Sequence, residues 1–154
     1  MLYGGEPVKT PQTQSGLLTD KEFSRELAER LAQAHDEGLG FAVVACVPQH
    51  LPGEGVAEVV EVAAGCLRTL MRDDDLAGLL DGEVLAVVLA SADATGARVF
   101  AHRLQGELRL RSYHLRNTVW ETGLAHLPAD GASAEELLAS AIDAARNRRR
   151  LLAV

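Results

Sequence analysis

The chain has 154 residues, of which 47% are hydrophobic, and a formal net charge of −7. This length and apolar content are typical of one globular domain with its own core, and they exclude a disordered chain. The acidic charge argues against binding to nucleic acid or to an anionic membrane surface, because both need a basic face. No apolar run reaches the roughly 20 residues of a membrane-spanning helix and no signal peptide is visible, so we expect a cytoplasmic protein.

The first half of the chain contains a linker-like segment followed by a helix, a strand and a second helix. Residues 1–15 are rich in proline, glycine and polar side chains, and are predicted to be a linker or the end of an upstream domain. Thr19, with Glu22 three residues later, forms a capping-box pattern that predicts a helix start, and Gly38 predicts its end. The apolar run "LGFAVVACV" predicts a central strand, and residues 55–71 predict a helix.

The second half contains a hairpin followed by further helices and strands. The segments "DLAGLL" and "VLAVVLA" predict two strands around a tight "DG" turn. A helix is predicted for "ADATGARVFAHRLQGEL", two strands for "LRLRSYHL" and "NTVWETGLAHL", a helix for "SAEELLASAIDAARN" and a closing strand for "RRRLLAV". This order predicts an α+β fold, with a mixed central β-sheet of about five strands flanked by helices and related to ferredoxin-like layouts.

The two cysteines, Cys46 and Cys66, lie within apolar segments. We expect them to be reduced core thiols rather than a disulfide, as is usual in cytosolic proteins. The histidines and cysteines also lack the spacing of metal ligands, so no metal site is expected.

Four segments show a family pattern in a fixed order with ungapped spacing. They read "SGLLTDKEF", "LRTLMRDDDLAGLLDGEVLAVVL", "GARVFAHRL" and "VWETGLAHLPADGASAEELLASAIDAA". In that order they resemble "TGLxNRRxF", "LRxxLRxxDxxARLGGDEFAILL", the "A…AERL" helix and "TVSIGVA…LLxxADxAL" of the GGDEF domain of diguanylate cyclases. The resemblance covers roughly residues 12–153. It implies a nucleotidyl cyclase-like fold, with a degenerate GGDEF domain over residues 16–154.

The catalytic positions depart from the family pattern. Its signature pentapeptide corresponds here to "DGEVL", in which Asp81 replaces a glycine and Val84 replaces an acid, while Glu83 alone keeps a metal-ligand position. The resemblance also implies an aspartate at the end of the first strand, but no Asp or Glu occurs over residues 38–53. The loop that follows is shortened to "PQHLPGEG". Because Mg²⁺-dependent phosphoryl transfer needs hard oxygen ligands, we expect no catalytic residues, no bound magnesium and no cyclase activity.

The product-binding inhibitory site of the family, in contrast, is matched. Its R-x-x-D motif corresponds to Arg72 and Asp75, five residues before the pentapeptide, and its arginine on the following helix corresponds to Arg103. Arginine pairs in two-pronged fashion with guanine O6 and N7 and suits phosphate, while an aspartate accepts from the N–H groups of guanine. The resemblance therefore implies that Arg72, Asp75 and Arg103 bind cyclic di-GMP.

The resulting functional hypothesis is a catalytically inactive GGDEF domain that acts as a cyclic di-GMP receptor without a cofactor. As an effector or response-regulator output domain, it would be joined to an upstream receiver or sensor domain. It would signal to that domain or to an unknown protein partner, and the ligand could bridge two copies into a homodimer. One alternative is a protein-interaction or dimerisation domain with a vestigial site, because an isolated R-x-x-D is usually a solvated turn with local ion pairs. Another is a residual enzyme that uses Glu83 and an unrecognised metal site.

Overall fold

The computed structural model of the chain describes residues 17–48, 56–90, 93–112, 119–126 and 133–153. The predicted linker at 1–15 and most of the shortened loop, at 49–55, lie outside the described residues. The elements are α1 (Asp20–Glu37), β2 (Phe41–Pro48), α2 (Val56–Leu70), β3 (Leu76–Leu80), β4 (Val84–Ala90), α3 (Ala94–Ser112), β5 (Trp120–His126) and α4 (Ala134–Ala153). The predicted α+β class is confirmed.

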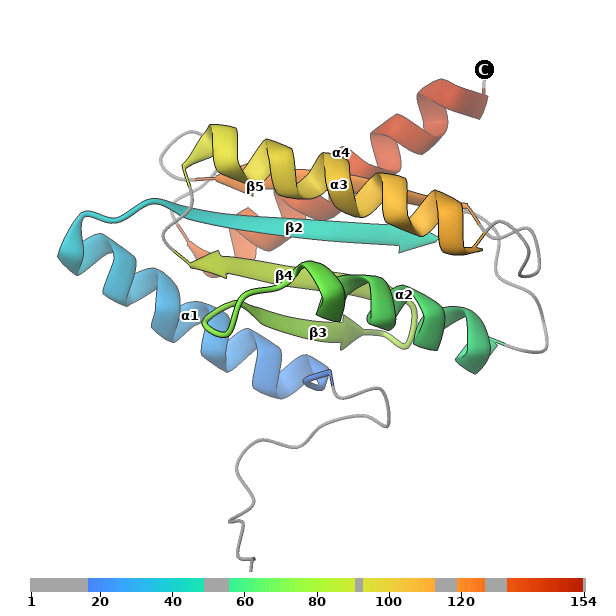
Figure 1. Cartoon of the computed structure of the whole chain (residues 1–154). Coiled ribbons are helices and arrows are strands. Elements are labelled where there is room, and N and C mark those ends of the chain that lie inside the picture. Colours follow the sequence, from blue (N-terminus) through green and yellow to red (C-terminus); the bar gives the residue numbers. More distant parts are fainter. Residues whose placement is uncertain (1–16, 49–55, 91–92, 113–118, 127–132, 154) are drawn as a thin grey trace, which may run out of the picture.

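The strands form one four-stranded sheet in the order β3-β4-β2-β5 (Figure 1). All three pairs of neighbouring strands are antiparallel, and an isolated parallel bridge joins Leu18 to Gly78 of β3. β2 lies between two partners and all eight of its residues are buried. A continuous apolar run is what a strand needs when both of its faces are covered.

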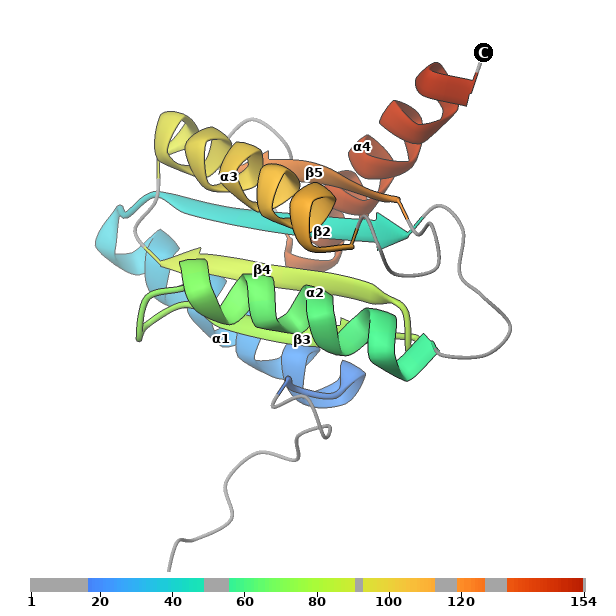
Figure 2. The same ribbon diagram turned by 45° about the vertical axis from the view of Figure 1, so that its right-hand side comes forward.

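Helices cover both faces of the sheet, as Figures 1 and 2 show, with α2 and α3 on one face and α1 and α4 on the other. Alternate residues of β2 divide between the two layers of core because successive side chains of a strand point to opposite faces. Val44 and Cys46 pack with α2 and α3, while Val43 and Val47 pack with α1 and α4.

The first helix begins and ends where predicted, but the predicted capping box does not form. Gly38 adopts a left-handed conformation with φ 67° and terminates α1, which glycine does with little steric cost. Thr19 occupies the N-cap position, but its side chain makes no capping hydrogen bond. Glu22 forms an ion pair with Arg25 on the next turn instead of reaching back to the cap. The predicted capping box is therefore wrong.

The sheet has four strands in the described part of the chain, not about five, because two predicted strands are helical. The start of "LRLRSYHL" forms the C-terminal end of α3, where Leu108 is buried, like Leu104 one turn earlier, and Leu110 is 71% exposed. This pattern of burial follows the helical spacing of four residues. A short alternation of leucine and arginine fits the period of a strand as well as that of a helix, so the sequence did not distinguish them. The segment "RRRLLA" continues α4. Residues 113–118, which include the rest of the first segment, lie outside the described residues.

A side chain occupies part of the outer edge of β5, the last strand of the sheet. The buried amide of Gln105, on α3, accepts the N–H of Thr122 at 2.9 Å and donates to the carbonyl oxygen of Trp120. The amide thus satisfies two backbone groups that a neighbouring strand would otherwise pair with.

Cys46 and Cys66 are both free and buried, as expected. Burial raises the pKa of each thiol, and the proximity of Cys66 raises the pKa of Cys46 further. Both are therefore protonated near neutral pH and act as small apolar core residues. Across the described residues, no helix combines the length and apolar character needed to cross a bilayer.

Candidate functional site

The R-x-x-D segment forms a closed turn between α2 and β3. The N–H of Asp75 donates to the carbonyl of Arg72 at 3.1 Å, and the N–H of Arg72 donates back to Oδ2 of Asp75 at 2.9 Å. Aspartate is suited to this place because its short carboxylate can accept from the backbone close by in the chain. These two hydrogen bonds fix the positions of Arg72 and Asp75 relative to each other.

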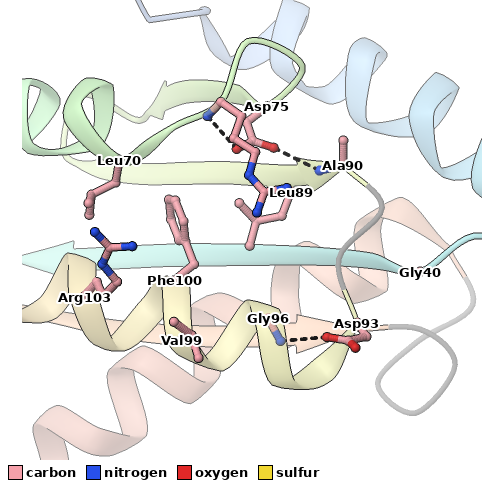
Figure 3. A pocket seen from close by; sticks show the side chains of 11 residues that line it. Gly40, Leu70, Asp75, Leu89, Ala90, Asp93, Gly96, Val99, Phe100 and Arg103 are labelled. Atoms are coloured by element: carbon pink, nitrogen blue, oxygen red, sulfur yellow. Dashed lines mark hydrogen bonds between the residues drawn. The ribbon is translucent and has the colours of Figure 1, made fainter.

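Asp75 also connects this turn to the neighbouring strand. Its Oδ1 accepts the N–H of Ala90, the last residue of β4, at 3.1 Å (Figure 3). One carboxylate thus holds the end of β4 beside the end of α2. The bond also shows that Asp75 has a structural role apart from any ligand.

The third predicted residue, Arg103, comes from α3. This helix is capped by Asp93, whose Oδ1 accepts the N–H of Gly96 at 2.7 Å. Val99, Phe100 and Arg103 then recur at helical spacing and share one side of the helix. In Figure 3 the side chains of Phe100 and Arg103 extend from α3 toward Leu70 at the end of α2.

These elements enclose a cavity of about 390 Å³. Arg72, Asp75 and Arg103 all line it, so the structure brings together the three residues singled out in the sequence. The remaining lining comes from the ends of β2, β4 and α2 and from α3: Gly40, Leu70, Leu89, Ala90, Asp93, Gly96, Val99 and Phe100. The volume lies in the range of roughly 300–1,000 Å³ that is usual for small-molecule sites.

The two arginines of the cavity are available to an anionic or acceptor group of a ligand. Arg72 and Arg103 are exposed, and within the described part of the chain neither guanidinium forms an ion pair. The lining carries two guanidinium groups and two carboxylates, those of Asp75 and Asp93. Both carboxylates already accept backbone N–H groups, whereas the two guanidinium groups form no ion pair with them. Guanidinium groups in this state are suited to binding phosphate or the acceptor edge of a base.

The two other aspartates of the turn, Asp73 and Asp74, do not line the arginine-lined cavity. Asp73 and Asp74 are exposed, and the backbone carbonyl of Asp74 accepts from Nη1 of Arg30 on α1. Asp74 lines a separate cavity of about 450 Å³ beside α1. The "RDDD" stretch thus contributes to two adjacent hollows, with only its first and last residues in the arginine-lined one.

The structural role of Asp75 leads to a stability prediction. We expect Asp75→Ala to lower the free energy of unfolding by about 1–2 kcal/mol, because two backbone N–H groups lose their acceptor. Urea denaturation of the purified domain measures this change. Asp73→Ala removes the same charge from an exposed neighbour and is expected to change stability by less than about 0.5 kcal/mol. Equal stability of the two variants would contradict the assigned role.

The "DG" step of the "DGEVL" segment lies in the β3–β4 hairpin turn, as predicted. Asp81 and Gly82 both have positive φ, at 52° and 74°, the combination that a type I′ turn requires. The N–H of Asp81 donates to the carboxylate of Asp20 at the start of α1, at 3.1 and 3.3 Å. Asp20, Asp81 and the exposed Glu83 place negative charge at this turn, where the charges of a triphosphate would be repelled.

The residues near this turn do not fit the magnesium ion that an active cyclase of this fold would need. β2 contributes only apolar residues. Glu121 of β5 pairs in register with Val47 but is 1% exposed, and in-register side chains share a face of the sheet, here the one covered by α1 and α4. No group of three or more His, Cys, Asp or Glu side chains suited to a metal occurs among the residues that the structure describes.

Sequence reasoning missed the apolar part of the arginine-lined cavity. Phe100, Val99 and Leu70 line it, but no motif in the sequence assigned them to a ligand site. Their signal was present in the helical spacing, since Val99 and Phe100 lie one turn before Arg103. Leu89 and Ala90 had no comparable signal, because only the strand order brings the end of β4 to this place.

Neither a protein-family model nor a curated protein matches the sequence. Solved structures of GGDEF domains do match the fold. The GGDEF domain of FimX from Pseudomonas aeruginosa superimposes with a TM-score of 0.79 at 15% identity, covering 93% of this chain and 95% of that one.

Two further structures agree. The GGDEF domain of DgcB from Caulobacter crescentus, in complex with c-di-GMP, has a TM-score of 0.77 at 18% identity, with 94% of this chain and 92% of that chain covered. The GGDEF domain of YfiN (TpbB) from Pseudomonas aeruginosa has a TM-score of 0.77 at 21% identity, with 89% and 92% covered. Identities this low speak to architecture alone. The chain therefore has the fold of GGDEF domains, the diguanylate cyclase fold.

Proposed function

We propose that this chain is a catalytically inactive GGDEF-fold domain that binds cyclic di-GMP in the cavity lined by Arg72, Asp75 and Arg103. The observation that carries the proposal is the convergence of these side chains, from the α2–β3 turn and from α3, on one cavity. Local sequence determines the first two together, but Arg103 reaches them only through the packing of α3 beside α2. The space between these three side chains is of the size of a ligand site, which supports a role in ligand binding.

The chemistry of the lining matches the chemistry of this ligand. Each guanine presents O6 and N7 acceptors to a guanidinium, and each phosphate presents oxygens that favour arginine. The oxygens of Asp75 each keep a lone pair beyond their bonds to Arg72 and Ala90. They can therefore also accept from guanine N–H groups. A domain of the same fold, that of DgcB, was solved with c-di-GMP, which adds support.

Three features support the absence of cyclase activity. No carboxylate occurs over residues 38–53, Val84 replaces an acid of the family pattern, and Asp20, Asp81 and Glu83 place like charge at the hairpin turn. Each weakens the binding of a magnesium–nucleotide complex. Together they support a receptor that needs neither metal nor cofactor.

In this role the domain would be cytoplasmic and would act as an output domain. Binding would change contacts with an upstream receiver or sensor domain, with an unknown protein partner, or with a second copy bridged by the ligand. The part of a bound cyclic dinucleotide that lies outside the cavity would be at the surface and available for such contacts.

Isothermal titration calorimetry of the wild-type domain with cyclic di-GMP tests the proposal. We expect saturable heat at tens of micromolar ligand or below, and no product when the domain is incubated with GTP and Mg²⁺. Absence of heat at those concentrations would overturn the receptor assignment. Turnover of GTP that is lost in Glu83→Gln would overturn the assignment of inactivity.

One observation favours the alternative of an interaction or dimerisation domain with a vestigial site. Both carboxylate oxygens of Asp75 already accept backbone N–H groups, which is reason enough to keep this aspartate without a ligand. Under this alternative, calorimetry gives no heat, and sedimentation shows the same oligomeric state with and without cyclic di-GMP.

A further inference from the structure

The arginine-lined cavity has an apolar wall on α3 that the charged residues do not explain. Phe100 lines it and is half-buried, and Val99 beside it is 53% exposed. Leu70 and Leu89 extend the apolar surface from α2 and β4. Figure 3 shows the ring of Phe100 projecting from α3 between Leu70 and Leu89. A site for a small inorganic anion has no use for such a surface.

Phe100 is not needed to fill the centre of the core under α3. That role belongs to the fully covered face of the helix, where Ala97, Leu104 and Leu108 are 0% exposed. Phe100 packs only against the margin of this core cluster. Its ring is therefore partly supported from below and partly open to the cavity, which is how an aromatic side chain is held when it serves as a binding platform.

The guanidinium group of Arg103 and the ring of Phe100 come from the same stretch of α3. Phe100 and Arg103 are separated by three residues on α3 and so share one side of it. A flat ligand lying against the ring has the Arg103 guanidinium one turn along the helix, and Arg72 lines the same cavity from the α2–β3 turn. The arginines can then reach its edge or its phosphate while the ring covers a face.

We infer that Phe100 is the specificity-determining platform of this cavity, against which one purine base of the ligand stacks. The inference rests on the proposed function and adds to it the element that separates a nucleobase from a bare phosphate. Stacking of a base on an aromatic side chain contributes about tenfold or more to affinity. Guanidinium groups alone hold phosphate of any origin. The cavity thereby selects a purine-containing anion over inorganic phosphate or pyrophosphate.

The test is calorimetry with cyclic di-GMP on the wild type, Phe100→Leu and Phe100→Tyr. Leucine keeps an apolar side chain for the margin of the core but removes the aromatic face, and tyrosine keeps the ring. We expect affinity to fall about tenfold or more in Phe100→Leu and to stay within about threefold of wild type in Phe100→Tyr. Leu110→Ala, on the same helix and 71% exposed outside the cavity, is the matched control and is expected to bind like wild type. Inorganic pyrophosphate is expected to bind far more weakly than cyclic di-GMP to the wild type.

The outcomes separate this inference from the function on which it rests. If the wild type gives no heat, the proposed function fails and the inference fails with it. If the wild type binds but Phe100→Leu binds equally well, or Phe100→Tyr loses as much as Phe100→Leu, the stacking role is overturned while the receptor assignment stands.

A second measurement needs no variant and holds even if Phe100→Leu folds poorly. In the complex of the wild-type domain with cyclic di-GMP, nuclear Overhauser effects between guanine H8 and the ring protons of Phe100 are expected. A saturated complex without these contacts overturns the inference.

Discussion

Arg72→Ala and Arg103→Ala are each expected to weaken cyclic di-GMP binding at least about tenfold, because each removes a charge-assisted, two-pronged hydrogen bond worth roughly 1.5–3 kcal/mol. The fold should tolerate both changes. Arg72 holds its turn through backbone groups that alanine also has, and Arg103 is exposed on α3. Calorimetry measures the affinities, and thermal melting verifies that each variant is folded.

Each variant has a matched control that removes one positive charge from the same helix. Arg68→Ala on α2 removes an exposed arginine that pairs with Glu61, and Arg98→Ala on α3 removes an exposed arginine outside the cavity lining. Both controls are expected to bind within about twofold of wild type, since a distant surface charge is screened by salt. If the controls lose as much affinity as the cavity variants, binding depends on general charge and the assignment of the site is wrong.

The largest stability effect is expected from Gly123→Ala in β5. An added Cβ would lie 2.3 Å from the carbonyl oxygen of Ala141 and 2.3 Å from the backbone nitrogen of Ala145. Both atoms belong to the backbone of α4, which cannot move aside as a flexible side chain could. Overpacking of this kind costs about 3 kcal/mol. For a domain of this size that corresponds to a fall in melting temperature on the order of 10 °C, measurable by circular dichroism.

Gly106→Ala on α3 is the control, because it is the same substitution where a Cβ meets nothing within 4 Å. Alanine is the better helix former by about 0.8–1 kcal/mol, so this variant is expected to be more stable than wild type. If Gly123→Ala melts at the wild-type temperature, the direct packing of α4 on β5 would be contradicted.

Local patterns were sufficient where one physical signal dominated. The apolar run of β2 predicted a strand covered on both faces, the "DG" step predicted a turn with positive φ, and Gly38 predicted the end of a helix. The R-x-x-D segment is also local, because its two residues bind each other across a single turn. Local patterns failed where two periods fitted equally well, as at Leu108 and Leu110, and at Glu22, where a nearby arginine competed with the cap for the carboxylate.

The sequence by itself determined the class of the fold, the order of most elements, and the choice of Arg72 and Arg103 as the positively charged side chains for a ligand. The tertiary structure alone decided that α3 packs beside α2 with Arg103, Phe100 and Val99 on the cavity side. It also decided that the end of β4 reaches Asp75, and that Gln105 occupies the edge of β5 in place of a strand. The physical reason is that helical and strand periods assign residues to faces, whereas the rotation of one element against another depends on close packing across the core, such as α4 against Gly123.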